Sequence, residues 1–127
     1  MFETSKIKTY RDLVVWQKSM ALVTEIYKAT KSFPKDEIYS LISQMRRCAI
    51  SIPSNIAEGF GRKSTNDYIR FLNITMDSLY ELQTQLEISL NLRYTNEEIF
   101  NRFFELSREI ERMLGSMIKK ITDKDKS

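Results

Sequence analysis

Residues 64–90 read STNDYIRFLNITMDSLYELQTQLEISL, an uninterrupted stretch that contains neither glycine nor proline. It opens with Ser64 and Thr65, both of which are residue types that cap the amino terminus of a helix. Behind them, core-type residues recur at alternating steps of four and three, which is the spacing of one helix face. The members of this seam are Tyr68, Leu72, Thr75, Leu79, Leu82 and Leu86. The stretch therefore predicts a long amphipathic helix that ends near Asn91–Tyr94.

Three other segments show the same helical period, at about 13–30, 36–60 and 95–118. Short breaks separate them, and the first break contains Pro34, which disfavours helical geometry at Phe33. The last segment opens with Thr95 and Glu98, the spacing of a capping box. Beyond residue 118 the chain becomes a charged tail that we expect to fray.

The segment 36–60 contains Pro53, a residue that usually kinks or ends a helix. Because Ile52, Ile56 and Phe60 keep the apolar register across it, the pattern favours one kinked helix over two separate helices. Gly59 and Gly61 are expected to end this helix, since either can adopt the left-handed cap conformation.

These patterns predict an all-α protein, an antiparallel up-down-up-down four-helix bundle with a proline-kinked second helix. One domain is expected over 1–127, with a core at about 10–121 and frayed termini.

The third and fourth segments carry more apolar residues than one stripe requires, which indicates either a thick core or a subunit interface. These additional residues are Ile69, Phe71, Ile74, Met76, Tyr80, Phe100, Phe104, Leu114 and Ile118. We favour the interface, and therefore a homo-oligomer, partly because of the family resemblance described below. Trp16, Phe71, Phe103 and Phe104 are expected in the core or the interface. Gly115 is expected to mark a close approach between helices.

Composition restricts the chemistry. The net charge is +3 and there is no histidine, which excludes Ser-His-Asp and Cys-His nucleophiles and histidine-based metal sites. The single cysteine, Cys48, lies in an apolar pattern and is expected to be a buried, unreactive thiol. Carboxylates such as Glu58, Asp77 and Glu81 suit hard metal ions, but on helices they are usually solvated or paired. We therefore predict a non-enzyme with no cofactor and no metal.

No secretory signal and no membrane-spanning run is apparent in the sequence, so a cytoplasmic protein that does not bind membranes is expected. No feature of the chain points to a small-molecule substrate.

Residues 46–62, RRCAISIPSNIAEGFGR, are the least generic part of the chain. Ser51, Asn55 and Glu58 are spaced by four and three and share a helix face, which Arg47 extends by one turn. This segment resembles the bacterial four-helix-bundle proteins first described from intervening sequences in large-subunit rRNA genes. Its SIPSNIAEG string (51–59) carries the resemblance. Further similar strings are LVVWQK (13–18), YIRFL (68–72) and SLYELQTQL (78–86).

The resemblance extends over about Tyr10 to Ile121. It implies an antiparallel four-helix bundle, ring-shaped assembly with a pentamer in related bundles, and no established enzymatic activity. A more distant similarity is to the accessory subunit of diversity-generating reverse transcriptases, whose basic ring binds nucleic acid. The motif residues that the resemblance singles out are Ser51, Pro53, Asn55, Glu58, Gly59 and Glu81.

Two functions stay open at this point. The first is RNA or DNA binding by an oligomer, through basic residues around the second and third helices. These candidates are Arg46, Arg47, Arg62, Lys63 and Arg70. The same arginines can instead form structural ion pairs with Glu58, Asp67 and Glu81. The second function is a structural scaffold or protein–protein adaptor, in which the amino-terminal arm with Phe2 and Tyr10 docks on a neighbour.

Overall fold

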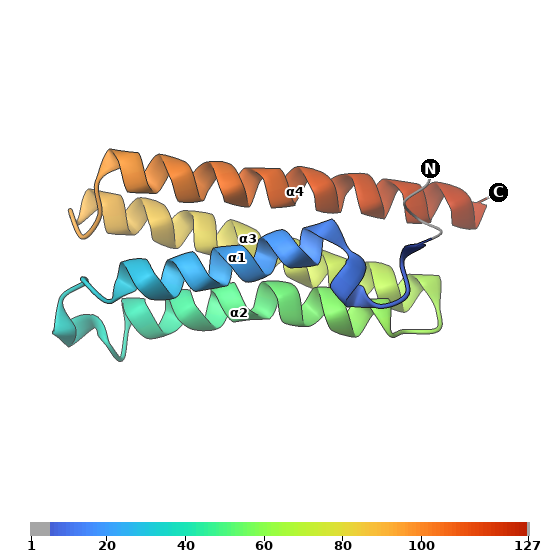
Figure 1. Ribbon diagram of the computed structural model, residues 1–127, viewed down its shortest axis with the longest axis horizontal. Helices are drawn as coiled ribbons and strands as arrows, with labels where there is room; N and C mark the ends of the chain where they lie inside the picture. The colour runs from blue at the N-terminus through green and yellow to red at the C-terminus, as the bar shows by residue number, and fades with distance from the viewer. Residues whose placement is uncertain (1–5, 127) are drawn as a thin grey trace.

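A computed structural model describes residues 6–126 as a bundle of four helices, with no strand in that part of the chain (Figure 1). The helices are α1 (Val14–Thr30), α2 (Leu41–Phe60), α3 (Thr65–Asn91) and α4 (Glu97–Lys126). Short 3-10 helices, η2 (Tyr10–Asp12) and η3 (Lys35–Glu37), precede α1 and α2. Consecutive helices run in opposite directions, and α1 packs on α4 as well as on α2 (Figure 1). The all-helical bundle predicted from the sequence is confirmed. Phe2 lies outside the described residues.

The core follows the predicted seams. Leu72, Leu79 and Leu82 of α3 are completely buried, and Ser64 caps this helix by accepting a hydrogen bond from the Asp67 N–H at 3.1 Å. Thr75 sits in the same buried row because its hydroxyl donates to the Phe71 carbonyl at 3.0 Å. Burying a hydroxyl that is hydrogen-bonded destabilises the fold little. Truncating one of these leucines to alanine is expected to lower the free energy of unfolding by about 2–5 kcal/mol.

The α1–α2 connection differs from the sequence prediction, because α2 begins at Leu41 and not near Asp36. Glu37 lies instead in η3, where its carboxylate accepts hydrogen bonds from the Ser40 hydroxyl and, at 2.7 Å, from the Tyr94 hydroxyl. The Tyr94 ring also packs on buried Phe33, with ring centroids 5.4 Å apart. A tertiary contact with the α3–α4 loop therefore holds these residues out of the helix.

Pro53 lies inside α2, which runs without interruption from Leu41 to Phe60. One helix rather than two is confirmed, and the size of the kink stays a prediction. The expected left-handed glycine cap is wrong, since Gly61 has φ −80° and none of the described glycines has a positive φ. Instead the Gly61 N–H donates to the carbonyls of Ala57 and Glu58, at 3.3 and 3.2 Å.

Gly59 and Gly115 have opposite surroundings. A Cβ added to Gly59 would lie 2.8 Å from the Phe71 Cβ, so the absence of a side chain lets α2 approach α3 closely. A Cβ added to Gly115 would meet no atom within 4 Å. The predicted close approach at Gly115 is therefore wrong, and the close approach occurs at Gly59.

Two details of α4 also differ from the prediction. Asn96, rather than Thr95, caps the helix, because its Oδ1 accepts the Ile99 N–H at 2.8 Å. The helix then continues to Lys126, through the charged residues that the sequence indicated as a frayed tail. An ion pair between Lys119 and Asp123, 3.1 Å apart at i,i+4 spacing, supports these last turns.

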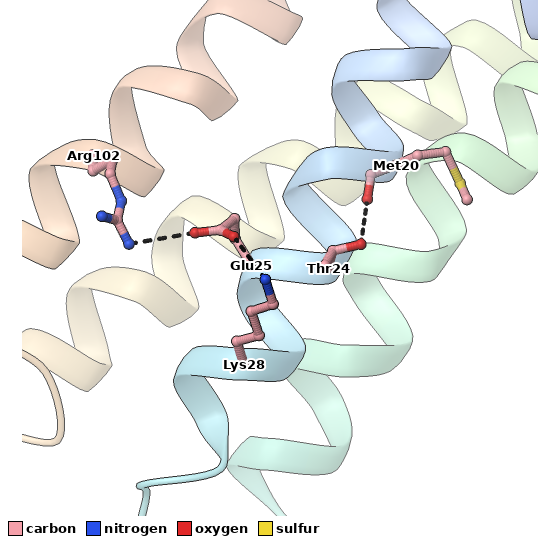
Figure 2. A network of polar contacts seen from close by, with 5 residues as sticks. All are labelled: Met20, Thr24, Glu25, Lys28 and Arg102. Carbon is pink, nitrogen blue, oxygen red and sulfur yellow. Dashed lines mark hydrogen bonds and ion pairs between the residues drawn. The ribbon is translucent and has the colours of Figure 1, made fainter.

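Exposed ion pairs connect α1 to α4. Glu25 of α1 contacts both Arg102 of α4 at 3.3 Å and Lys28 at 3.9 Å (Figure 2). The hydroxyl of the adjacent Thr24 donates to the Met20 carbonyl, one turn earlier in α1, at 3.2 Å (Figure 2). Exposed pairs of this kind contribute at most about 1 kcal/mol each, so they add little to the stability of the bundle.

Within the described residues, none of the helices has the length and apolar character needed to cross a membrane.

Candidate nucleic-acid interface

The five basic residues predicted as a nucleic-acid site fall into two separate groups. Arg46 and Arg47 lie in the first half of α2, whereas Arg62 and Lys63 lie in the turn after it and Arg70 lies near the start of α3. At about 1.5 Å per residue, Arg46 and Arg62 are separated by roughly 24 Å along the helix axis. One short ligand segment cannot contact both groups in the same subunit.

Arg46 is part of the packing between α1 and α2. Its Nε donates to Thr30 Oγ1 at 2.9 Å, and its Nη2 lies 3.3 Å from the Tyr27 carbonyl oxygen. The guanidinium carbon sits 4.6 Å from the centre of the Tyr27 ring. Tyr27 is in the last turn of α1, where carbonyls lack helical partners. Arg46 therefore closes the carboxyl end of α1, and its partners are neutral groups rather than the carboxylates considered from sequence.

Arg47, one position further along, is exposed. Among residues 6–126 no hydrogen bond or ion pair of its side chain is found. It lines a surface hollow with Tyr39 and Ile50. Its charge is therefore free to meet an external anion.

Arg62, Lys63 and Arg70 form what we call the α2–α3 basic cluster. The guanidinium carbons of Arg62 and Arg70 lie 4.8 and 4.7 Å from the centre of the same Phe71 ring. Arg62 lies 3.6 Å from Glu58, and Arg70 lies 3.8 Å from Asp67. All four of these side chains are about half exposed, and such pairs are weak and screened by salt. Phosphate oxygens can therefore compete for both guanidinium groups.

Small polar residues of the α2 motif make hydrogen bonds to α3 and within α2. The Ser51 hydroxyl donates to the Cys48 carbonyl at 2.7 Å and is hydrogen-bonded to the Ser78 hydroxyl, also at 2.7 Å. The Cys48 thiol donates to the Ser78 carbonyl at 3.0 Å. Asn55 Nδ2 donates back to the Ser51 carbonyl at 2.8 Å. These contacts form a polar seam between α2 and α3, which explains the small polar residues of the motif without a ligand.

The remaining motif residues differ in their exposure to solvent. Pro53 and Gly59 are buried, whereas Glu58 and Glu81 are exposed. The predicted common face of Ser51, Asn55 and Glu58 is therefore divided between the helix interface and solvent.

Glu81 lies next to buried polar groups of the seam. Gln85 is only 5% exposed; its Nε2 lies 3.3 Å from Glu81 Oε2, while its Oε1 has no partner among the described residues. Burial, together with the Glu81 charge, raises the pKa of the Cys48 thiol to about 12. A thiol with this pKa stays protonated at neutral pH and is a poor nucleophile.

Within residues 6–126 no group of three acidic or cysteine side chains is arranged to hold a metal ion. Glu58, Asp77 and Glu81 are exposed, each at a different turn of its helix.

Tyr68, which lies near Arg70 in the sequence, is too buried to serve as a platform on which a base could stack. Its half-buried ring meets Phe60 edge-on, with centroids 6.3 Å apart, and burial raises the pKa of its hydroxyl. Phe71, expected in the core or an interface, is buried at 8% exposure and carries the two arginines on its ring. Sequence gives no sign of this, because Arg62 reaches the ring from the turn between α2 and α3.

An apolar groove runs between α1 and α2, and sequence analysis missed it. Met20 and Ile50 are each 42% exposed, and Tyr39 is 94% exposed. Two adjoining hollows of about 310 and 480 Å³ make up the groove, and Ile50 lines both. Their other lining residues are Tyr10, Trp16, Met20, Val23, Tyr27, Ile38, Tyr39, Ile42, Ser43, Arg46, Arg47, Pro53, Ser54 and Ala57.

The extra apolar residues of α3 and α4 are instead largely used inside the subunit. Leu114 and Phe71 are buried, and Met76, Phe100 and Ile118 pack against the core, although Ile74 and Tyr80 stay exposed. The thick-core alternative accounts for most of them.

The fold and the α2–α3 polar seam define a four-helix-bundle protein that carries exposed basic residues at its α2–α3 turn. The chain belongs to the 23S rRNA-intervening sequence protein family, whose model matches residues 11–116.

Among solved structures it is similar to a protein with unknown function from the S23 ribosomal protein family of Bacteroides thetaiotaomicron VPI-5482. The two share 29% sequence identity over 84% of this chain and 99% of the other, with a TM-score of 0.76. No curated protein matches the sequence. The comparisons thus give the family and the fold, and they name no catalytic activity.

Proposed function

We propose that this protein is a non-catalytic, self-associating bundle that binds the phosphate backbone of RNA or DNA through its α2–α3 basic cluster. The observation that carries the proposal is the pair of half-exposed guanidinium groups that share the Phe71 ring, with Lys63 beside them. Contact with the ring holds each arginine in place, so less side-chain entropy is lost when a phosphate binds. Arg47 supplies a further free cation on the flank of α2.

One cluster of three cations gives modest affinity, because each phosphate contact is a screened, sequence-independent attraction. Self-association multiplies the contacts by placing several clusters on one particle. The α1–α2 groove supports this part of the proposal, since it exposes contiguous apolar side chains that a neighbouring subunit can cover. The family resemblance favours a ring, and light scattering gives the number of subunits directly.

The test is fluorescence anisotropy of a labelled RNA duplex, titrated with protein at several salt concentrations. A triple variant, Arg62→Gln with Lys63→Gln and Arg70→Gln, is expected to bind more weakly. The slope of log K against log salt is expected to fall by about 1 for each lost phosphate contact. The matched control is Arg102→Gln with Arg108→Gln and Arg112→Gln, which removes equal charge from exposed positions of α4.

If both triple variants lose affinity equally, binding follows net charge alone and the cluster is not the site. If the wild-type protein binds none of the three ligands at low salt, namely RNA, single-stranded DNA and duplex DNA, the nucleic-acid function is refuted. Size-exclusion chromatography with light scattering on the same samples tests self-association separately, and a monomer at all concentrations refutes that part.

The α1–α2 groove also favours a second candidate, a scaffold or protein–protein adaptor without nucleic-acid binding. Tyr39 is almost fully exposed beside Ile38, which is also 44% exposed, and aromatic residues are enriched in protein interfaces. This function predicts an oligomer that is indifferent to RNA and is broken by Ile50→Arg. The triple cluster variant would leave that oligomer intact.

A further inference from the structure

A hollow of about 440 Å³ lies at the end of the bundle that holds the start of α1 and the last turns of α4. It exists because the helices differ in length. Helix α1 has 17 residues and α4 has 30, so they span about 25 and 45 Å. In Figure 1, α4 continues well past the start of α1, where the chain turns aside through η2. The last turns of α4 therefore lack a full helical neighbour on this side.

The walls of the hollow are almost entirely apolar. Met113, Met117 and Ile121 line it at successive turns of α4, over about 12 Å of helix. The lining residues contributed by the rest of the chain are Ile7, Asp12, Leu13, Val14, Val15 and Tyr68. A volume of this size is within the range of small-molecule sites. Methionine side chains adapt their shape to different apolar occupants.

Two charged side chains, Lys120 and Asp12, line the hollow. Lys120 lines it near its Ile121 end, and no partner for the ammonium is found in the described chain. One oxygen of the Asp12 carboxylate, Oδ2, accepts the N–H groups of Lys8 and Thr9 at 2.9 and 3.1 Å. These two hydrogen bonds lower the pKa of Asp12, so it stays ionised and engaged. Asp12 keeps its own negative charge, so Lys120 is the lining group with which an anion can pair.

We infer that this hollow is a binding site for a fatty acid: an elongated apolar chain lies along α4 and its carboxylate pairs with Lys120. The hollow extends about 12 Å along α4, which fits an elongated chain better than a compact ring. Among the described lining residues, the unpaired Lys120 at one end sets its direction. This inference is independent of nucleic-acid binding, and it differs from the sequence analysis, which indicated no small-molecule ligand.

The test uses the full-length protein labelled with ¹³C in its methionine methyl groups, titrated with laurate below its micelle-forming concentration. The signals of Met113 and Met117 are expected to shift saturably. Those of Met45, in the core, and Met20, in the α1–α2 groove, are expected to stay in place. Absence of a saturable shift overturns the inference, as does an equal shift of Met20, which would indicate adsorption to exposed apolar surface.

Charge recognition is tested with a matched pair of neighbouring lysines. Lys120→Glu is expected to raise the Kd for laurate about tenfold. Dodecanol, which lacks the carboxylate charge, is expected to bind the wild-type protein with a similarly raised Kd. Lys119→Glu makes the same change at a residue that pairs with Asp123 and does not line the hollow, so it is expected to leave the Kd within about twofold. Equal loss in both variants overturns the Lys120 assignment.

Two further arms separate other occupants. Ser116→Phe adds an apolar ring at an exposed lining position, so it is expected to block laurate while leaving the helical circular dichroism spectrum unchanged. If the Met113 and Met117 signals shift on dilution without laurate, a second copy of the chain covers the hollow, and the fatty-acid site is refuted.

Discussion

Replacing Arg46 with alanine removes three contacts that close the carboxyl end of α1. These are the 2.9 Å hydrogen bond to Thr30 Oγ1, the 3.3 Å contact with the Tyr27 carbonyl, and the guanidinium stacked 4.6 Å from the Tyr27 ring centre. A hydrogen bond from a charged group contributes about 1.5–3 kcal/mol, and an exposed cation–π contact about 0.5–1 kcal/mol.

The expected loss is smaller than the sum of these values. The second contact is long, and Arg46 is only half buried, so water replaces part of what is lost. Thr30 also keeps its own bond to the Ile26 carbonyl at 2.8 Å, so no buried hydroxyl is left without a partner. We expect Arg46→Ala to lower the free energy of unfolding by about 2 kcal/mol.

The assay is urea unfolding followed by circular dichroism. With an m-value of about 2 kcal/mol/M, the midpoint falls by about 1 M. Arg47→Ala is the control, because its exposed side chain has no partner in the described chain, and it is expected to change stability by less than about 0.5 kcal/mol. Arg46→Lys keeps the charge but loses the planar fork, so it is expected to recover less than half of the loss.

The reasoning is refuted if Arg46→Ala and Arg47→Ala are equally stable and both weaken RNA binding. Arg46 would then be a phosphate ligand rather than a residue that joins α1 to α2.

Three further predictions concern the seam and the loops. Gly59→Ala is expected to destabilise the protein by about 1–3 kcal/mol in urea unfolding, because the new Cβ would lie 2.8 Å from that of Phe71, whereas Gly115→Ala, in open space, is expected to stabilise it by up to about 1 kcal/mol. The hydrogen bonds of Ser40 and Tyr94 lower the pKa of Glu37. Their contribution to the free energy of unfolding is therefore complete above the ordinary glutamate pKa of about 4.3 and is lost as the pH falls through the lowered value. Glu37→Gln is expected to make the free energy of unfolding depend less on pH in this acidic range. Cys48, with a pKa of about 12, is expected to resist a thiol reagent at pH 7 in the native protein and to react only at the rate of unfolding; rapid native-state labelling would contradict its burial.

Periodicity was enough to predict the four helices, because each helix buries one face and residues such as Leu72 and Leu79 repeat at its period. It could not place the start of α2, since Tyr94, far away in the chain, holds Glu37 out of the helix. Nor could it separate Gly59 from Gly115. Both lie in helical patterns, and only the neighbour across the interface shows which one is needed for packing.

The candidate site was predicted less well, for a related reason. Sequence spacing places basic residues along the chain, but contacts between segments of the fold decide their roles. Arg46 meets α1, whereas Arg62 and Arg70 meet on Phe71. Neither arrangement has a local signature.

The polar seam between α2 and α3 has a consequence for the order in which the bundle opens. These two helices are joined by a short turn and share buried side-chain hydrogen bonds, including that of the Ser89 hydroxyl to the Met45 sulfur at 3.5 Å. By contrast, exposed ion pairs such as Lys18–Glu109 contribute to the contact between α1 and α4. Units with local, buried contacts are the last to open in the native state. In hydrogen–deuterium exchange, the α2–α3 hairpin is therefore expected to retain its amide protons longest, and α1 to lose its protons first.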